Sequence, residues 1–134
     1  MTTIFRISEC GFGNDRMDKE EMKRRTKQFA LRMIRLVESL PRGRIAEVLG
    51  RQLLRSGTSV GADYRAACRA KSTADFVSKM RTVEEETDES LCWMELLVES
   101  AIVQTSKLEP LMREADEIIS IIVSSIKTAR KNKK

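Results

Sequence analysis

The chain has 134 residues, of which 41% are hydrophobic, 34% are charged and only 4% are aromatic. This length supports one domain with one core, and the scarcity of aromatic residues, with only two prolines, argues against a β-sandwich. The formal charge of +5 comes from 25 basic and 20 acidic residues, and the chain has three cysteines and no histidine. We therefore expect neither a zinc site nor a disulfide, and the usual general base near neutral pH is absent.

No apolar run of membrane-spanning length occurs, and none of the kind that directs secretion lies at the start. We therefore expect a cytoplasmic protein without a membrane partner. Residues 1–16 include Gly11, Gly13 and Asn14 and show no hydrophobic period, which predicts a flexible N-terminal extension. Residues 17–130 are expected to form the folded domain, and residues 131–134 a disordered basic tail.

Two helices are predicted in the first half of the domain. Apolar side chains recur every three or four residues over about Asp18–Leu40, and Pro41 and Gly43 end this pattern. A second helix is expected over about Arg44–Arg69. Its predicted core stripe consists of Ile45, Val48, Leu49, Leu53, Ser56, Val60 and Ala67.

The second helix carries small residues where a helix normally carries bulk. Gly57 and Gly61 each cost roughly 1 kcal/mol relative to alanine in a helix interior, so we expect a compensation, either close approach to a neighbouring helix or a local kink. Three interpretations are open: close packing against a helix of the same subunit, an interface between subunits, and a ligand site. Close packing is favoured, because this glycine spacing lets two helix backbones approach each other.

A third, long helix is predicted to start at Ser72 or Thr73 as N-cap, with Asp75 in its first turn. Its core seam consists of two rows at seven-residue spacing. These rows are Phe76, Val83, Ser90 and Leu97, and Met80, Thr87, Met94 and Ala101.

The last predicted helix has Ser106 as its expected N-cap, Glu109 as the partner in a capping box, and Pro110 in the first turn. Its apolar stripe is wide enough to indicate burial beyond one subunit. Because the connections between the four helices are short, the sequence predicts an all-α, antiparallel, up-down-up-down four-helix bundle.

Four segments carry a resemblance to a known family, and they lie at residues 52–62, 75–80, 93–97 and 114–119. The first is the most specific and contains Gln52, Arg55, Ser56, Gly57, Ser59 and Gly61. Over about Asp18–Lys131 the chain resembles the four helix bundle proteins related to those encoded by intervening sequences in bacterial 23S ribosomal RNA genes. The resemblance implies a bundle that assembles into a ring, typically a homopentamer. The genomic setting of the family, and basic relatives that act beside reverse transcriptases, point to nucleic acid as a partner.

We expect the second and third helices to form a hairpin that turns near Lys71. Two residues at the same sequence distance before and after Lys71 then lie at the same height along the hairpin. Arg55 then lies at the level of Glu86 to Asp88, and Asp63 at the level of Lys79. We predict that an acidic residue of the third helix holds Arg55 and that Asp63 pairs with Lys79.

The third helix is acidic, since residues 73–103 hold eight acidic and two basic side chains. A run of carboxylates in its middle suggests either a metal site or a salt-bridged, solvated helix face. Di-metal sites in bundles use Glu-x-x-His pairs on facing helices, and this chain has no histidine. The salt-bridged face is therefore favoured. The run consists of Glu84, Glu85, Glu86, Asp88 and Glu89.

Basic side chains are the candidate contacts to nucleic acid. They are Arg51, Arg65, Arg69, Lys71, Lys127, Arg130 and Lys131. Phosphate binding requires such charges on one shared surface, whereas dispersed charges are ordinary solvated groups. Our leading hypothesis is a non-enzymatic, ring-forming homo-oligomer without a cofactor that contacts structured RNA or DNA. The alternative is an adaptor that recruits another protein and contacts no nucleic acid, and an enzyme that uses the carboxylates of the third helix is least favoured.

Overall fold

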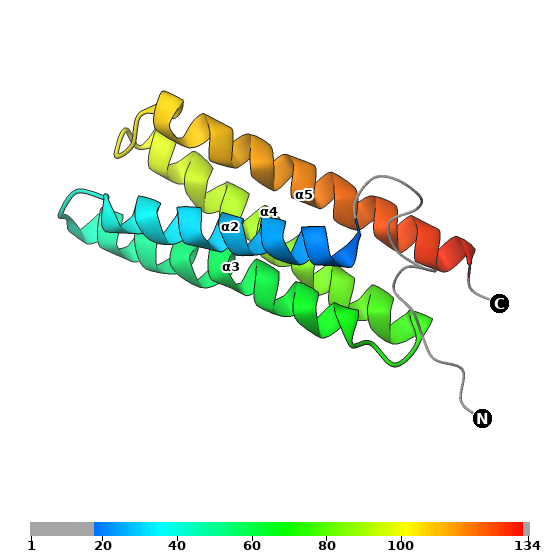
Figure 1. Ribbon diagram of the computed structural model, residues 1–134. Helices are drawn as coiled ribbons and strands as arrows, with labels where there is room; N and C mark the ends of the chain where they lie inside the picture. The colour runs from blue at the N-terminus through cyan, green and yellow to red at the C-terminus, as the bar shows by residue number, and fades with distance from the viewer. Residues whose placement is uncertain (1–17, 133–134) are drawn as a thin grey trace.

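The computed structural model describes residues 18–132, which form a bundle of four α-helices (Figure 1). The helices are α2 (Lys19–Glu38), α3 (Arg44–Cys68), α4 (Thr73–Glu99) and α5 (Thr105–Lys131). This confirms the predicted all-α bundle, and each helix runs antiparallel to the next along the chain (Figure 1), in agreement with the up-down-up-down order. The predicted N-terminal extension lies outside the described residues. Lys131, placed in the tail by the sequence, is the last residue of α5, and Asn132 caps the helix.

Side chains cap two of the helix N-termini. The Asp18 carboxylate accepts a hydrogen bond from the backbone N–H of Glu21 at 2.8 Å and so starts α2. The Ser72 hydroxyl accepts a hydrogen bond from the backbone N–H of Asp75 at 3.0 Å, which confirms the predicted start of α4. In both helices the first turn also holds acidic residues, which the positive end of the helix dipole stabilises.

The connection from α4 to α5 differs from the prediction. Ala101, expected in the core seam, follows the end of α4, is exposed and has a φ of 63°. The backbone N–H groups of Ile102 and Val103 both donate to the carbonyl of Leu97, at 3.0 and 3.1 Å, and Val103 is buried. This closure turns the chain early, so α5 starts at Thr105 with Gln104 as N-cap. The predicted N-cap Ser106 is wrong, and Pro110 lies in the second turn.

The core confirms most of the predicted helix faces. In α4 seven of the eight predicted seam residues are buried, and only Ala101 is not. In α3 the prediction is correct from Leu53 onward but wrong at the start, where Ile45 and Val48 are 59% and 48% exposed. The buried residues in that first part of α3 are Ala46 and Gly50. Alanine and glycine are too small to stand out in a pattern of large apolar residues, so the sequence did not indicate that these positions are buried.

Three of the four seams between neighbouring helices are extensive, since α3 packs against α2 and α4, and α4 packs against α5, whereas α2 and α5 contact each other sparsely. Arg25 of α2 bridges this sparse seam. Its Nε donates to Glu114 at 2.6 Å, and its terminal nitrogen donates to Glu114 and Glu117. Hydrogen bonding to Glu114 raises the pKa of Arg25 above its ordinary value, so the bridge keeps its positive charge throughout the physiological range.

Between Asp18 and Asn132, none of the helices combines the length and the apolar character that a membrane span needs.

Candidate nucleic-acid interface

The two glycines of α3 lie against α2. A methyl group added to Gly57 would overlap Cγ of Met33 and lie 3.1 Å from its Cβ, and one added to Gly61 would lie 3.2 Å from Oγ1 of Thr26. Both Met33 and Thr26 are buried residues of α2. Of the three interpretations of this glycine pair, close packing within the subunit is therefore the one the structure shows.

The hydroxyl side chains next to these glycines have two kinds of partner. Ser56 and Ser90 share a buried hydrogen bond of 2.8 Å between α3 and α4. Thr58 and Ser59 instead donate to the carbonyls of Leu54 and Arg55 one turn earlier, each at 2.7 Å.

Arg55 forms the predicted link between α3 and α4. Its guanidinium donates to Glu86 at 3.4 Å and also to Glu89. Glu89 in turn accepts a hydrogen bond from the indole N–H of Trp93 at 3.1 Å. Hydrogen bonding to Glu89 raises the pKa of Arg55, whereas burial raises the pKa of Glu86, with Arg55 acting in the opposite direction. Gln52, one turn before Arg55, is half-buried.

The predicted pair of Asp63 with Lys79 is wrong. Nζ of Lys79 lies 2.6 Å from the carboxylate of Asp75, one turn earlier on its own helix. Within residues 18–132 Asp63 has no ion pair, and burial raises the pKa of its carboxyl group. Its negative charge also helps to raise the pKa of Glu86, so Asp63 lies near a second carboxylate. Equal height along two helices therefore did not ensure that the side chains face each other.

Six of the seven predicted basic residues lie near the C-terminal ends of α3 and α5, which Figure 1 shows at the same end of the bundle. These six, which we call the basic end, are Arg65, Arg69, Lys71, Lys127, Arg130 and Lys131. All six are exposed, and none forms an ion pair with another described residue. Arg51 is different, because it lies in the first half of α3 and pairs with Glu47 at 3.1 Å. Arg51 therefore does not belong to the basic end.

The opposite end of the bundle exposes an apolar patch that the sequence did not predict. We define it by Ile45 and Val48 of α3 and Trp93 and Leu96 of α4. Leu96 is 42% exposed and Trp93 is half-buried. Ile45 and Val48 continue, at helical spacing, the stripe of α3 that holds Arg55, while Trp93 and Leu96 continue the stripe of α4 that holds Glu89. Because Arg55 joins these two stripes, their apolar ends are adjacent.

These features define a class of protein, a four-helix bundle with one basic end and one partly apolar end. Residues 18–132 contain no group of three or more Cys, Asp or Glu side chains placed to hold a metal ion. A family model described as 23S rRNA-intervening sequence protein matches residues 18–124, and the chain belongs to this family.

A solved structure is similar over most of the chain. It is the crystal structure of a protein with unknown function from the S23 ribosomal protein family of Bacteroides thetaiotaomicron. The two sequences are 33% identical, the alignment covers 83% of this chain and 99% of that chain, and the TM-score is 0.77. None of the curated proteins matches the chain.

Proposed function

We propose that this chain is a non-catalytic bundle protein that assembles into a homo-oligomeric ring, typically a pentamer, and binds structured RNA or DNA through its basic end. The observation that carries the proposal is the gathering of six exposed cations, all without ion pairs among the described residues, at one end of the bundle. Cations of this kind release condensed counterions when they neutralise phosphates, which is the main source of affinity for nucleic acid. The family name refers to an RNA element and agrees with such a partner.

Self-association is supported by two separate apolar surfaces. The apolar patch lies on α3 and α4, whereas Ile119 and Val123 form a half-buried pair one turn apart on α5, outside the core cluster. A ring needs a head-to-tail interface, in which two different surfaces of each subunit meet. This subunit offers two such surfaces on different helices.

Ring formation would also strengthen contacts to nucleic acid. Rotation about one axis places the same end of every subunit at the same height. In a ring whose bundles stand parallel to that axis, all basic ends would lie on one face. Once one subunit has bound, the remaining contacts become intramolecular and their effective concentration is high. Weak phosphate contacts in each subunit then add up to a strong interaction.

A filter-binding titration with a structured RNA, repeated at several salt concentrations, tests the nucleic-acid part. The triple variant Arg65→Gln, Arg69→Gln, Lys71→Gln is expected to lower the affinity by about 10-fold or more and to reduce the salt slope by about 1 for each lost phosphate contact. Arg51→Gln is the control, because its charge is already paired with Glu47. A wild-type protein that binds neither RNA nor DNA at low salt would contradict the nucleic-acid role.

Light scattering at micromolar concentration tests the ring. The wild type is expected to be an oligomer, and Val48→Glu is expected to dissociate it, because a carboxylate would be buried in the apolar interface. Ala62→Glu adds the same charge to an exposed position of α3 beyond the patch and should leave the mass unchanged. A monomeric wild type would exclude the ring.

The apolar patch also favours the second candidate function, an adaptor for another protein. An exposed group of large apolar side chains marks a surface that binds a protein partner. An adaptor would remain monomeric and would not bind RNA. In a pull-down it would retain one stoichiometric protein partner after nuclease treatment.

A further inference from the structure

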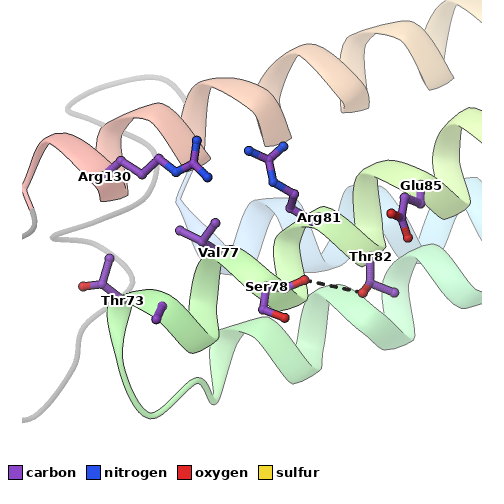
Figure 2. Close-up of a pocket in the computed structure, with 8 residues that line it drawn as sticks. Thr73, Val77, Ser78, Arg81, Thr82, Glu85 and Arg130 are labelled. Carbon is purple, nitrogen blue, oxygen red and sulfur yellow. Dashed lines mark hydrogen bonds between the residues drawn. The ribbon is translucent and has the colours of Figure 1, made fainter.

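A depression of about 500 Å³ lies between the first half of α4 and the last turns of α5. Figure 2 shows the guanidinium groups of Arg81 on α4 and Arg130 on α5 pointing toward each other across it. Ser78 and Thr82 of α4 line the same depression, and Val77 contributes an apolar wall. Arg130 is part of the basic end, whereas Arg81 lies in the acidic helix and was not among the basic residues selected from the sequence.

Negative charge in the depression does not fully compensate the two arginines. Glu84 lies 3.5 Å from one nitrogen of Arg81, which is a long contact between partly exposed groups. Glu85 also lines the depression, but Figure 2 places it at the end remote from Arg130. Arg130 itself has no ion pair within residues 18–132. Two like charges directed at one space repel each other, so an anion bound between them would be stabilised.

The two guanidinium groups can supply the donors that an anion needs, whereas the hydroxyl groups of Ser78 and Thr82 lie apart from the space between them (Figure 2). The Thr82 hydroxyl donates a long hydrogen bond of 3.5 Å to the carbonyl of Ser78 (Figure 2). Guanidinium groups bind phosphate oxygens with two parallel hydrogen bonds. The apolar wall at Val77 can accommodate the carbon skeleton attached to a phosphate.

We infer that this depression is a phosphate-binding site, in which the guanidinium groups of Arg81 and Arg130 hold the oxygens of one backbone phosphate. The inference rests on the proposed nucleic-acid function and extends it, because it assigns one phosphate contact per subunit to a formed site. The same chemistry would accept a free phosphate ion or a phosphorylated small molecule. The experiment therefore has one arm for each source.

The first arm measures binding of a structured RNA to full-length protein at several salt concentrations. The double variant Arg81→Gln, Arg130→Gln is compared with Arg35→Gln, Arg42→Gln, which removes two exposed arginines at the opposite end of the bundle. We expect the first variant to bind about 10-fold more weakly than the second, with a salt slope smaller by about 1 per engaged subunit.

The second arm measures the thermal unfolding midpoint in inorganic phosphate and in sodium chloride of equal ionic strength. A phosphate ion that binds only the folded state raises this midpoint by mass action. The phosphate-specific rise should be present in the wild type and in Arg35→Gln, Arg42→Gln, and absent in Arg81→Gln, Arg130→Gln. The general stabilising effect of phosphate as a salt is common to all three proteins.

The outcomes separate the two proposals. Weaker RNA binding of the Arg81, Arg130 variant supports the site with a backbone phosphate as its ligand. A phosphate-specific stabilisation without any RNA binding supports the site with free phosphate as its ligand and contradicts the proposed nucleic-acid function. If the two double variants behave alike in both arms while the wild type binds RNA, the inference is overturned and the proposed function stands.

Discussion

Helix α3 uses two different devices on its two buried faces. Toward α2 it presents Gly57 and Gly61, whose missing side chains let α2 approach until Met33 and Thr26 fill the space. Toward α4 it presents polar groups, with the buried Ser56 paired to Ser90 and Arg55 paired to two glutamates. The glycine face depends on close packing, most strictly at Gly57, whereas the polar face depends on partners that lie at the same height along the two helices.

The difference between these faces shows how one helix specifies two neighbours. Close approach fixes the distance to α2, and a methyl group added at Gly57 would overlap Met33. Paired polar groups favour one register to α4, since a shift along the helix would break the hydrogen bond between Ser56 and Ser90 and the ion pairs of Arg55. Substitutions on the glycine face should therefore be more costly than those on the polar face. In all the stability measurements below, the protein concentration must be constant, because association contributes to stability.

The largest effect is expected for Gly57→Ala. The added methyl group would overlap the side chain of buried Met33, so we expect the free energy of unfolding to fall by about 2 kcal/mol, typical of overpacking. Urea denaturation followed by circular dichroism measures this change. Gly61→Ala is the matched control with a smaller expected cost, because its contact with Thr26 is 3.2 Å and belongs to a side-chain oxygen. Greater stability of Gly57→Ala than of the wild type would show that α2 is not in close contact there.

The next effect is expected on the polar face, for Ser90→Ala. It removes the partner of the buried Ser56 hydroxyl and should lower the free energy of unfolding by about 1 kcal/mol. The double variant Ser56→Ala, Ser90→Ala should cost less than the sum of the two single variants, because both partners are then gone. Strict additivity in this cycle would mean that the two hydroxyls do not interact.

A smaller loss than that of Ser90→Ala is expected for Arg55→Gln, because this guanidinium is about half exposed and water screens its ion pairs. Burial already raises the folded-state pKa of Glu86, and Arg55 counteracts this rise. In the Arg55→Gln variant the pKa of Glu86 rises further. The stability that the variant loses relative to the wild type should therefore grow as pH rises through the titration of Glu86. In acid the carboxyl group of Glu86 is protonated in both proteins, so this loss should be absent. Denaturation midpoints from pH 3 to pH 8 measure this, and a loss independent of pH would contradict the role of Arg55.

The smallest effect, a gain in stability, is expected for Asp63→Asn. Burial raises the pKa of the Asp63 carboxyl group, so its charged form destabilises the folded state above that pKa. The amide removes this cost, and at neutral pH we expect a gain of about 0.5 kcal/mol or less. The gain should disappear as pH falls through the folded-state pKa, because Asp63 is then neutral in the wild type as well. A loss of stability at neutral pH would indicate that the Asp63 charge has a favourable partner.

The arrangement of the helices was predictable because it depends on local signals. Apolar periodicity located all four helices, and the Ser72 cap and the Pro41 to Gly43 turn bounded them closely. The Arg55 pairing was also predictable, since the distance from a hairpin turn determines height. The same argument failed for Asp63 and Lys79, because the rotation of each helix about its axis decides which side chains meet, and Lys79 had Asp75 within reach on its own helix.

Other features of the candidate site depend on packing that leaves little trace in the sequence. The first turns of α3 bury Ala46 and Gly50, so the larger Ile45 and Val48 were wrongly placed in the core and the apolar patch was missed. The convergence of Arg81 and Arg130 arises only when α5 returns along α4. Neither residue has a sequence neighbour that indicates the other, so only the three-dimensional arrangement reveals the depression between them.

The sparse contact between α2 and α5 has a consequence for motion. Three seams of the bundle are extensively packed, whereas α2 and α5 contact each other sparsely and are bridged by the ion pairs of Arg25 with Glu114 and Glu117. Local opening of the bundle should therefore begin at the seam between α2 and α5. In this opening α2 would move away from α5 and keep its glycine contacts with α3. Amide hydrogen exchange would record such an opening as faster exchange in α2 than in α4.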